Sequence, residues 1–199
     1  MNFSIPSRLV QASMDYRVEV ASSMEDILKA FAIRSAVYMS EQNCPYSEEF
    51  DQNDYCAMHL ICYANGEPAA TLRLRFFASF AKVERVAVLK RFRGEEISKV
   101  MILRVVDILR RKGYRTIYGH VQERLVPMWM KWGFKVVPQS RQFIFSDHRY
   151  VEMYGDLDPD PKAITMDTDP LTMLRPEGSW DEPGVLEASA ARPFTNPHQ

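Results

Sequence analysis

The stretch that decides the fold reads KVERVAVLKRFRGEEISKVMILRVVDILRRKG and covers residues 82–113. Its first part, 82–88, is rich in valine, which favours a β-strand. From 98 to 112 apolar side chains recur at helical spacing, and basic residues followed by Gly113 close the segment as they close many helices. The stretch therefore predicts a strand, a basic loop containing Gly94, and a long amphipathic helix.

The predicted elements on either side alternate between helices and strands. Before the stretch, the pattern predicts a helix at 24–39 and two strands at 57–64 and 69–77, which flank the turn signal Asn65-Gly66-Glu67-Pro68. After it, the pattern predicts a strand at 115–121, a helix at 123–132 and short strands at 135–137, 142–146 and 149–154. This order predicts an α/β fold with a mixed central sheet rather than a repeat array.

The net charge of −1 conceals two parts of different character. Residues 156–199 hold nine acidic and three basic residues and seven of the twelve prolines, whereas residues 1–155 carry a net charge of +5. We therefore expect one domain at 1–155 and an extension at 156–199. Apolar residues such as Ile164 and Trp180 predict that 156–180 docks on the domain, with the substrate cavity as one place to cover, and that the last 15 or so residues are mobile.

Composition argues against several classes of function. The chain has no global basic excess of the kind that binds nucleic acids, and no run approaches the roughly 20 apolar residues that span a membrane. Its first residues lack the pattern of a signal peptide, so we expect a cytoplasmic protein without stable membrane insertion. The three cysteines have no C-x-x-C spacing and the four histidines are far apart, which predicts no metal site.

The loop at 90–94 is the clearest candidate for binding an anion. It places Lys90, Arg91, Arg93 and Gly94 just before a predicted helix. A helix N-terminus offers unsatisfied N–H donors and a positive dipole potential, and glycine lets the backbone approach a ligand. The alternative is a solvated group of surface charges.

Taken together, VERVAV at 83–88, RFRG at 91–94 and the following helix resemble the signature strand, pyrophosphate loop and helix of the GNAT superfamily of N-acyltransferases. MWMKWGF at 128–134 resembles the helix-to-strand segment of that superfamily, and the resemblance covers about residues 20–155. It implies a mixed, mainly antiparallel central sheet flanked by helices. It also implies transfer of an acyl group from a phosphopantetheine thioester to an amine.

A narrower resemblance concerns the branch of this superfamily that depends on acyl-carrier protein. The acidic loop with Asp51 and Asp54, the hairpin strand with Arg73 and the ERVAV strand are similar to that branch, which contains acyl-homoserine lactone synthases and long-chain N-acyl amino acid synthases. Glu96 stands where the superfamily's loop has a small residue, and we expect it to crowd the pyrophosphate of coenzyme A. We therefore favour an acyl-carrier protein donor, keep acyl-CoA as the alternative and expect no tightly bound cofactor.

The resemblance implies roles for named residues. Glu84 is the candidate general base, although it would equally make an ion pair with Arg85 or Lys82. The backbone N–H groups of Val86, Ala87 and Val88 are candidates for pairing with the thioester and pantetheine, and Arg91, Arg93 and Gly94 for holding the phosphate. Arg73 or Arg75 is the candidate for the carboxylate of an amino acid, and Asp51 and Asp54 for its ammonium or for locking that arginine.

Two further residues qualify this mechanism. Trp129 stands where many acetyltransferases have a tyrosine that protonates the leaving thiolate, so no phenol acid is expected there. His120 lies inside a predicted strand, where a core histidine is the more common interpretation than a second base.

The predicted function is transfer of a long-chain fatty acyl group from acyl-carrier protein to the α-amine of an amino acid, with tyrosine as the candidate acceptor. Three alternatives stay open at this stage. They are an acetyl-CoA-dependent N-acetyltransferase, a lactone-forming homoserine acyltransferase, and a module that binds acyl chains or a carrier protein without turnover.

Overall fold

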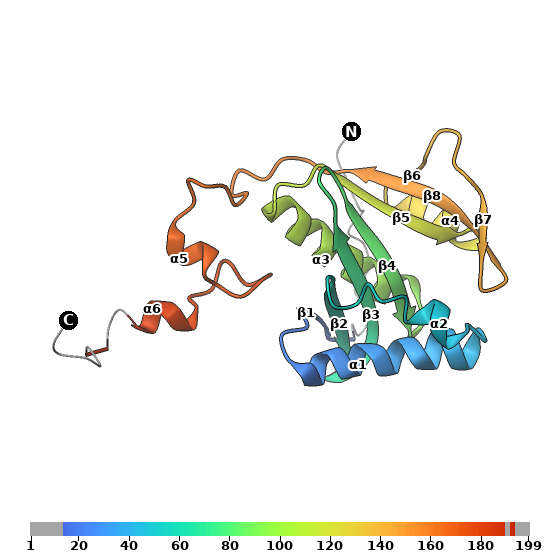
Figure 1. Ribbon diagram of the computed structural model, residues 1–199, viewed down its shortest axis with the longest axis horizontal. Coiled ribbons are helices and arrows are strands. Elements are labelled where there is room, and N and C mark those ends of the chain that lie inside the picture. Colours follow the sequence, from blue (N-terminus) through green and yellow to red (C-terminus); the bar gives the residue numbers. More distant parts are fainter. Residues whose placement is uncertain (1–13, 190–191, 194–199) are drawn as a thin grey trace.

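An eight-stranded sheet organises the molecule, and the computed structural model describes residues 14–189 and 192–193 (Figure 1). The strands are β1 (Tyr16–Val20), β2 (Met58–Ala64), β3 (Glu67–Phe76), β4 (Ala81–Val88), β5 (Thr116–Gln122), β6 (Lys135–Val136), β7 (Phe143–Phe145) and β8 (His148–Asp156). Their order is β1-β2-β3-β4-β5-β8-β6, with β7 paired to β8. Only β4 and β5 run parallel among these pairs, which confirms the predicted mixed, mainly antiparallel sheet.

Helices cover both faces of this sheet (Figure 1). They are α1 (Met24–Arg34), which continues into a π-helical segment (Ser35–Glu41), α2 (Tyr46–Glu49), α3 (Glu95–Arg111), α4 (Val126–Lys131), α5 (Pro170–Met173) and α6 (Val185–Ser189). Side chains alternate along β2: Leu60 and Cys62 belong to the core under α3, whereas Ile61 and Tyr63 pack with Ala30 of α1. The two long helices therefore lie on opposite faces.

Local sequence signals explain where these elements begin and turn. Ser23 caps α1 in a reciprocal capping box with Asp26. Asn65 and Gly66 both have positive φ angles, 50° and 84°, as a two-residue hairpin turn requires. The predicted hairpin is confirmed. Helix α3 begins at Glu95, three residues before its predicted start, and β1 was not predicted.

The fork between β4 and β5 is the feature that creates the site. The two strands pair only from Ala81 to Val83 on β4, and a Cβ added at Gly119 of β5 would lie 3.3 Å from the Val83 carbonyl oxygen. Beyond this point β4 contains a bulge, because Leu72 of β3 alone faces both Arg85 and Val86. Arg85 takes a left-handed φ of 52° there. The bulge turns β4 away from β5.

The segment 157–180 packs along α3, away from this fork. Leu157 and Trp180 join the core beneath α3, and the Ile164 amide donates to the Arg111 carbonyl at 2.7 Å. Arg111 donates in turn to the Lys162 carbonyl at 2.6 Å. The expectation of mobility for the last 15 or so residues falls partly outside the described residues, which include α6.

The sequence predicts neither a membrane-spanning segment nor a metal site. Among the described residues, no helix combines the length and the apolar character needed to cross a membrane. Within the same ranges, no three His, Cys, Asp or Glu side chains gather in a way that could hold a metal ion.

Candidate functional site

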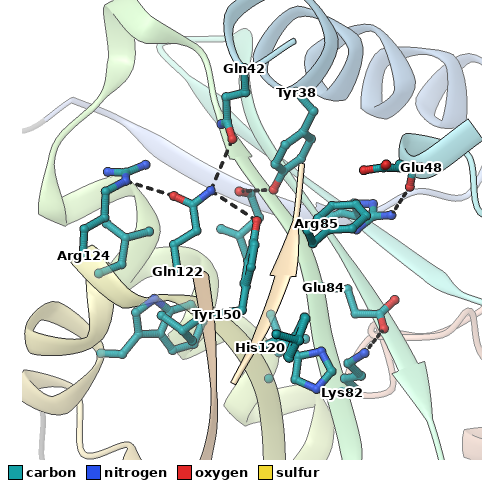
Figure 2. Close-up of a pocket in the computed structure, with 18 of the residues that line it drawn as sticks. Tyr38, Gln42, Glu48, Lys82, Glu84, Arg85, His120, Gln122, Arg124 and Tyr150 are labelled. Atoms are coloured by element: carbon teal, nitrogen blue, oxygen red, sulfur yellow. Dashed lines mark hydrogen bonds and ion pairs between the residues drawn. The ribbon is translucent and has the colours of Figure 1, made fainter. Parts of the chain in front are cut away.

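The fork between β4 and β5 opens into two adjoining cavities. The first, which we call the polar pocket, has a volume of about 350 Å³ and is drawn in Figure 2. Its polar lining comes from the π-helical segment, α2 and the loop after it, and from β4, β5, β8 and the turn after β5: Tyr38, Gln42, Glu48, Asp51, Lys82, Glu84, Arg85, His120, Gln122, Arg124 and Tyr150. Phe143 and Phe145 of β7 add an aromatic wall. This combination suits a small molecule that carries both charge and an apolar part.

The second cavity, which we call the apolar groove, has a volume of about 730 Å³. Its apolar lining consists of Val37, Val86, Val88, Leu125, Met128, Trp129 and Trp132. Arg93, Gly94 and Ser98 also line it, from the loop and first turn that lead into α3. The two cavities share Val86, Arg124 and Trp129, so ligands in each would meet at β4.

Strand β4 presents an open edge at this meeting point. Past Val83, β4 has no ladder partner on the β5 side among the described strands. Tyr38 donates a 2.7 Å hydrogen bond to the Val86 carbonyl and so supports the strand from the π-helical segment. An extended ligand can therefore pair with β4 in the way that a neighbouring strand would.

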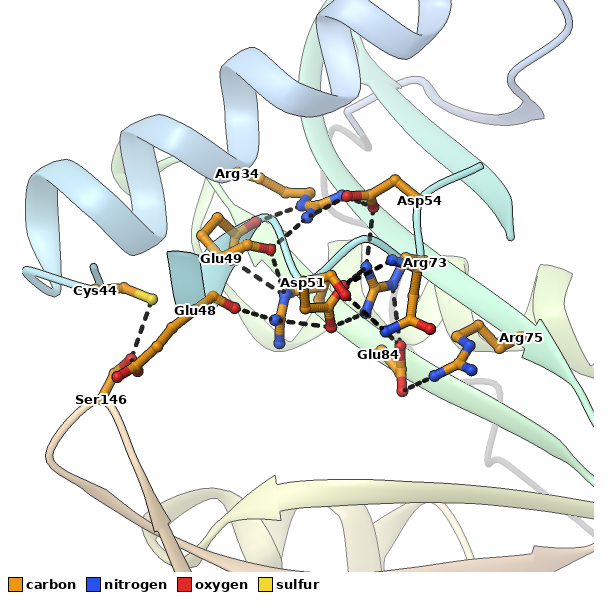
Figure 3. Close-up of polar contacts among 12 residues, drawn as sticks. Arg34, Cys44, Glu48, Glu49, Asp51, Asp54, Arg73, Arg75, Glu84 and Ser146 are labelled. Atoms are coloured by element: carbon orange, nitrogen blue, oxygen red, sulfur yellow. Dashed lines mark hydrogen bonds and ion pairs between the residues drawn. The ribbon is translucent and has the colours of Figure 1, made fainter. Parts of the chain in front are cut away.

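A buried network of charges lies behind the polar pocket (Figure 3). Arg73 is completely buried and its three nitrogens are all engaged. They donate to Asp51 at 2.7 Å, to Asp54 at 3.0 Å and to Glu84 at 2.6 Å. Because five N–H groups meet three carboxylates, Arg73 has no donor left for a substrate.

The same network fixes the loop that follows α2. Arg34 of α1 is also fully buried and forms ion pairs with Glu49 and Asp54. Arg85, at the bulge of β4, contacts Glu49 at 3.1 Å and Asp51 at 3.3 Å. Positive side chains from α1, β3 and β4 thus clamp one acidic loop against the sheet.

Charge pairing sets the protonation of these acids. Burial by itself would raise the pKa of Asp51, Asp54 and Glu84. Arg73 outweighs that effect at Asp51, Arg34 together with Arg73 does so at Asp54, and Lys82 together with Arg73 does so at Glu84. All three pKa values lie below their usual range, so the pocket presents carboxylates at neutral pH.

Comparison with known proteins identifies the fold that carries this geometry. The model of the acetyltransferase (GNAT) family matches residues 23–134, more than half of the chain. The chain belongs to the GNAT family. It is therefore an N-acyltransferase in the broad sense of that family. The match begins just before α1 and ends after α4, so it contains β4, the loop and α3.

One relative agrees with this assignment, and two solved structures share the fold. A candidate acetyltransferase of Bacillus subtilis is 30% identical over 139 residues, which are 68% of this chain and 93% of the relative. An acyl-CoA N-acyltransferase from Pseudomonas aeruginosa has the same fold, with a TM-score of 0.63, 22% identity and coverage of 72% of this chain and 99% of that one. A Bacillus subtilis acetyltransferase in complex with CoA covers 72% of this chain and 100% of its own, with a TM-score of 0.56 and 14% identity.

Within this GNAT fold the sequence-predicted residues fall into two groups. Glu84 and Asp51 line the polar pocket, while Arg73 and Asp54 stand behind it. Val86, Val88, Arg93 and Gly94 line the apolar groove, whereas the Ala87 side chain packs toward α1 with Ile33 and Val37. Arg91 lies outside both cavities and pairs with Glu67 at 2.7 Å.

Glu96 does not lie where it could crowd the pyrophosphate of coenzyme A. It does not line the apolar groove. Burial raises the pKa of Tyr16 in β1, and the nearby Glu96 carboxylate raises it further, which places Glu96 toward the first strand. Glu41 stands at the groove instead and forms an ion pair with Arg93.

Several pocket residues were missed by the sequence analysis or read as core. Tyr118, His120 and Gln122 lie at every second position of β5, and the last two line the polar pocket. Alternation along a strand could have grouped them. No local pattern in the sequence places Phe143, Phe145 or Tyr150 in the pocket, because their position depends on how β7 and β8 pair. Trp129 borders both cavities and packs on Trp132 and Phe134. The position at which many acetyltransferases have a tyrosine acid therefore holds an indole.

Proposed function

We propose that this protein transfers an acyl group from a phosphopantetheine thioester to the α-amine of an amino acid. The observation that carries the proposal is the meeting of the two cavities at the open edge of β4. A thioester in the apolar groove would bring its carbonyl carbon to Val86, where an amine in the polar pocket can reach it. Holding both reactants at one place replaces an encounter in solution by an oriented attack.

The donor would lie along β4 in the apolar groove. Its amide carbonyls would accept from N–H groups along Val86–Val88, because the carbonyls of Val86 and Val88 already accept from Tyr38 and Arg93. A strand N–H would also hydrogen-bond the thioester carbonyl oxygen as negative charge develops on it. The phosphate would lie at Arg93 and Gly94, where α3 begins. A thiolate with a pKa of about 8.5 is a fair leaving group even without an acid beside it.

The choice between two donors turns on charge at the loop. Arg93 is paired with Glu41, and Arg91 with Glu67, so both arginines of this loop already have a carboxylate partner. This favours the single phosphodiester of a carrier protein over the pyrophosphate of coenzyme A. We therefore propose a long-chain acyl-carrier protein as donor. Acetyl-CoA is the second candidate, because a relative of the same fold is in complex with CoA.

The acceptor would lie in the polar pocket. Glu84 and Asp51 are carboxylates there and would attract its ammonium group. Arg124 lines the pocket, its Nε donates to Gln122 at 2.9 Å, and its two terminal nitrogens have no partner among the described residues. With Arg73 fully occupied, we assign the carboxylate of the substrate to Arg124. The aromatic wall of Phe143 and Phe145 favours tyrosine or another aromatic amino acid.

Mass spectrometry of reaction products tests the proposal. The purified protein is incubated with palmitoyl- or lauroyl-carrier protein, with lauroyl-CoA and with acetyl-CoA, each together with a pool of amino acids. We expect an acyl amino acid, with tyrosine preferred, from the carrier protein. Turnover with acetyl-CoA alone contradicts the long-chain carrier donor. Absence of product with every donor contradicts the enzymatic proposal and supports a binding module.

A matched pair of acceptors tests the role of Arg124. Tyrosine and tyramine differ only by the carboxylate, so Arg124→Gln should raise KM for tyrosine at least 10-fold and leave KM for tyramine unchanged. Arg149, exposed on β8 and outside both cavities, provides the control variant Arg149→Gln. An equal effect of Arg124→Gln on both amines contradicts the assignment.

A further inference from the structure

His120 belongs to a three-residue chain of hydrogen bonds that sets which ring nitrogen carries the proton. Tyr118 donates its hydroxyl hydrogen to Glu152 at 2.6 Å, and the same phenol oxygen lies 2.8 Å from His120 Nε2. The single proton of the phenol is thus committed to the carboxylate, so the phenol oxygen accepts from the imidazole. Nε2 therefore carries the hydrogen, and Nδ1 keeps its lone pair.

The other ring nitrogen is free to react. His120 lines the polar pocket, and its Nδ1 has no hydrogen-bond partner among the described residues. Figure 2 shows the ring on the side of the pocket where Lys82 and Glu84 lie. Phe143 of β7 packs edge-on against the imidazole, with 4.5 Å between the two ring centroids, and restricts its orientation.

The charges around His120 keep it neutral. Burial lowers the pKa of His120 first, and Lys82 of β4 and Arg141 lower it further. Glu152 of β8 and Glu84 of β4 act in the opposite direction, and the balance brings the pKa to about 4. At neutral pH the imidazole is therefore an uncharged acceptor, and once protonated it gives the proton up readily.

We propose that His120 Nδ1 takes the proton from the acceptor nitrogen as the C–N bond forms, and passes it to the sulfur as the C–S bond breaks. The inference rests on the proposed acyl transfer. The ammonium held at Glu84 first releases one proton to solvent. The neutral amine then supplies the electron pair for the new C–N bond, the thiolate leaves with the C–S pair, and a second proton moves from nitrogen through His120 to sulfur. This route needs no phenol at Trp129.

Glu84 is less suited to this proton transfer. Its Oε2 accepts from Arg73 and its Oε1 contacts Lys82 at 2.7 Å, so both oxygens already face cations and the pKa is lowered. A carboxylate in that position binds an ammonium group well. We assign Glu84 to holding the amine, and His120 to moving its proton.

The first measurement determines the tautomer of His120 and needs no substrate. Long-range ¹H–¹⁵N correlation spectra of the intact protein should show His120 with Nε2 protonated and Nδ1 bare at pH 7. Tyr118→Phe removes the acceptor for Nε2–H and should populate the other tautomer, while a residue that merely packs would leave the spectrum unchanged. A proton on Nδ1 in the unaltered protein overturns the proposal.

The second measurement reads turnover. His120→Ala should lower kcat about 100-fold, within the range of general acid–base catalysis, with KM for the donor unchanged. Added imidazole should restore part of the rate of His120→Ala. The thermal midpoint of the variant provides the control, because imidazole would not restore activity lost through misfolding. Wild-type kcat in His120→Ala overturns the proposal, as does a large kcat loss in Glu84→Gln without one in His120→Ala.

These outcomes separate the two proposals. If the unaltered protein shows no turnover with any thioester, the proposed function fails and the proton route fails with it. If the unaltered protein turns over and His120→Ala is equally fast, only the role of His120 fails.

Discussion

The contacts of Arg73 differ from the role that the sequence predicted for it. From the sequence, Arg73 or Arg75 is the candidate for holding a substrate carboxylate. In the structure the loop with Asp51 and Asp54 folds over it, and the side chain is completely buried. The sequence contained all the partners, but nothing in their spacing says that residues 51 and 54 return to residue 73. The contacts match the alternative in which Asp51 and Asp54 lock Arg73 in place.

Removing the charge of Arg73 should destabilise the fold. Arg73→Leu leaves Asp51, Asp54 and Glu84 without their shared cation, and breaking a buried ion pair typically costs about 3–5 kcal/mol. Urea denaturation measures the loss. Arg75→Leu, which removes a partly exposed cation 3.7 Å from Glu84, should cost less than about 1 kcal/mol. Equal losses in the two variants would contradict a special role for Arg73.

The same network predicts the direction of the pH dependence. Asp51, Asp54 and Glu84 have pKa values lowered by folding, so their contribution is complete above the unfolded pKa of about 4 and is lost as the pH falls further. The stability difference between the unaltered protein and Arg73→Leu should therefore shrink below about pH 4. A difference that stays constant down to pH 2.5 would argue against these ion pairs.

At the scale of elements, prediction succeeded where the pattern is local. The Asn65-Gly66 turn and the apolar spacing of α3 define their elements by themselves, and both were predicted. β1 was missed although Tyr16, Val18 and Val20 alternate with Arg17 and Glu19, a pattern that is typical of a half-buried strand. The bulge at Arg85 and the fork beyond Val83 arise from pairing across the sheet, which no short window of sequence contains.

The fork also predicts the kinetic order of the reaction. The two cavities meet at Val86, so both substrates can be bound together and the acyl group can pass directly between them. Initial rates measured at several fixed donor concentrations should give intersecting lines in a double-reciprocal plot. Parallel lines, which indicate a covalent acyl-enzyme, would contradict direct transfer.

At the scale of the whole molecule, the basic residues behind the net charge of +5 in residues 1–155 serve several structural roles. Arg104, Arg110, Arg111 and Lys112 of α3 contact the segment 157–180, through carbonyl groups and Glu177. These cations therefore hold the chain's own extension. Arg91 and Arg93 lie instead in the loop at 90–94, and Arg34, Arg73 and Arg85 belong to the buried network. Total charge alone could not separate these groups, because all of them contribute to the same net charge of residues 1–155.

The segment 157–180 should contribute stability more than activity. Trp180 is buried against the core, and none of the described residues of the segment lines either cavity. Trp180→Ala should lower the free energy of unfolding by about 3 kcal/mol and change kcat less than twofold. Met166, almost fully exposed, gives the matched control Met166→Ala, with no measurable change. A selective loss of kcat in Trp180→Ala would mean that the segment acts on the site.

The open edge of β4 has a thermodynamic consequence. Past Val83, the lack of a neighbouring strand among the described strands leaves a seam along β4, where the carbonyls of Val86 and Val88 accept from the side chains of Tyr38 and Arg93. A bound pantetheine chain would act as a transient extra strand and close this seam. Donor binding should consequently raise the melting temperature, because a ligand that binds only the folded state stabilises it. Scanning fluorimetry with pantetheine, CoA and a carrier protein would rank the donors by the rise that each produces, before any product is sought.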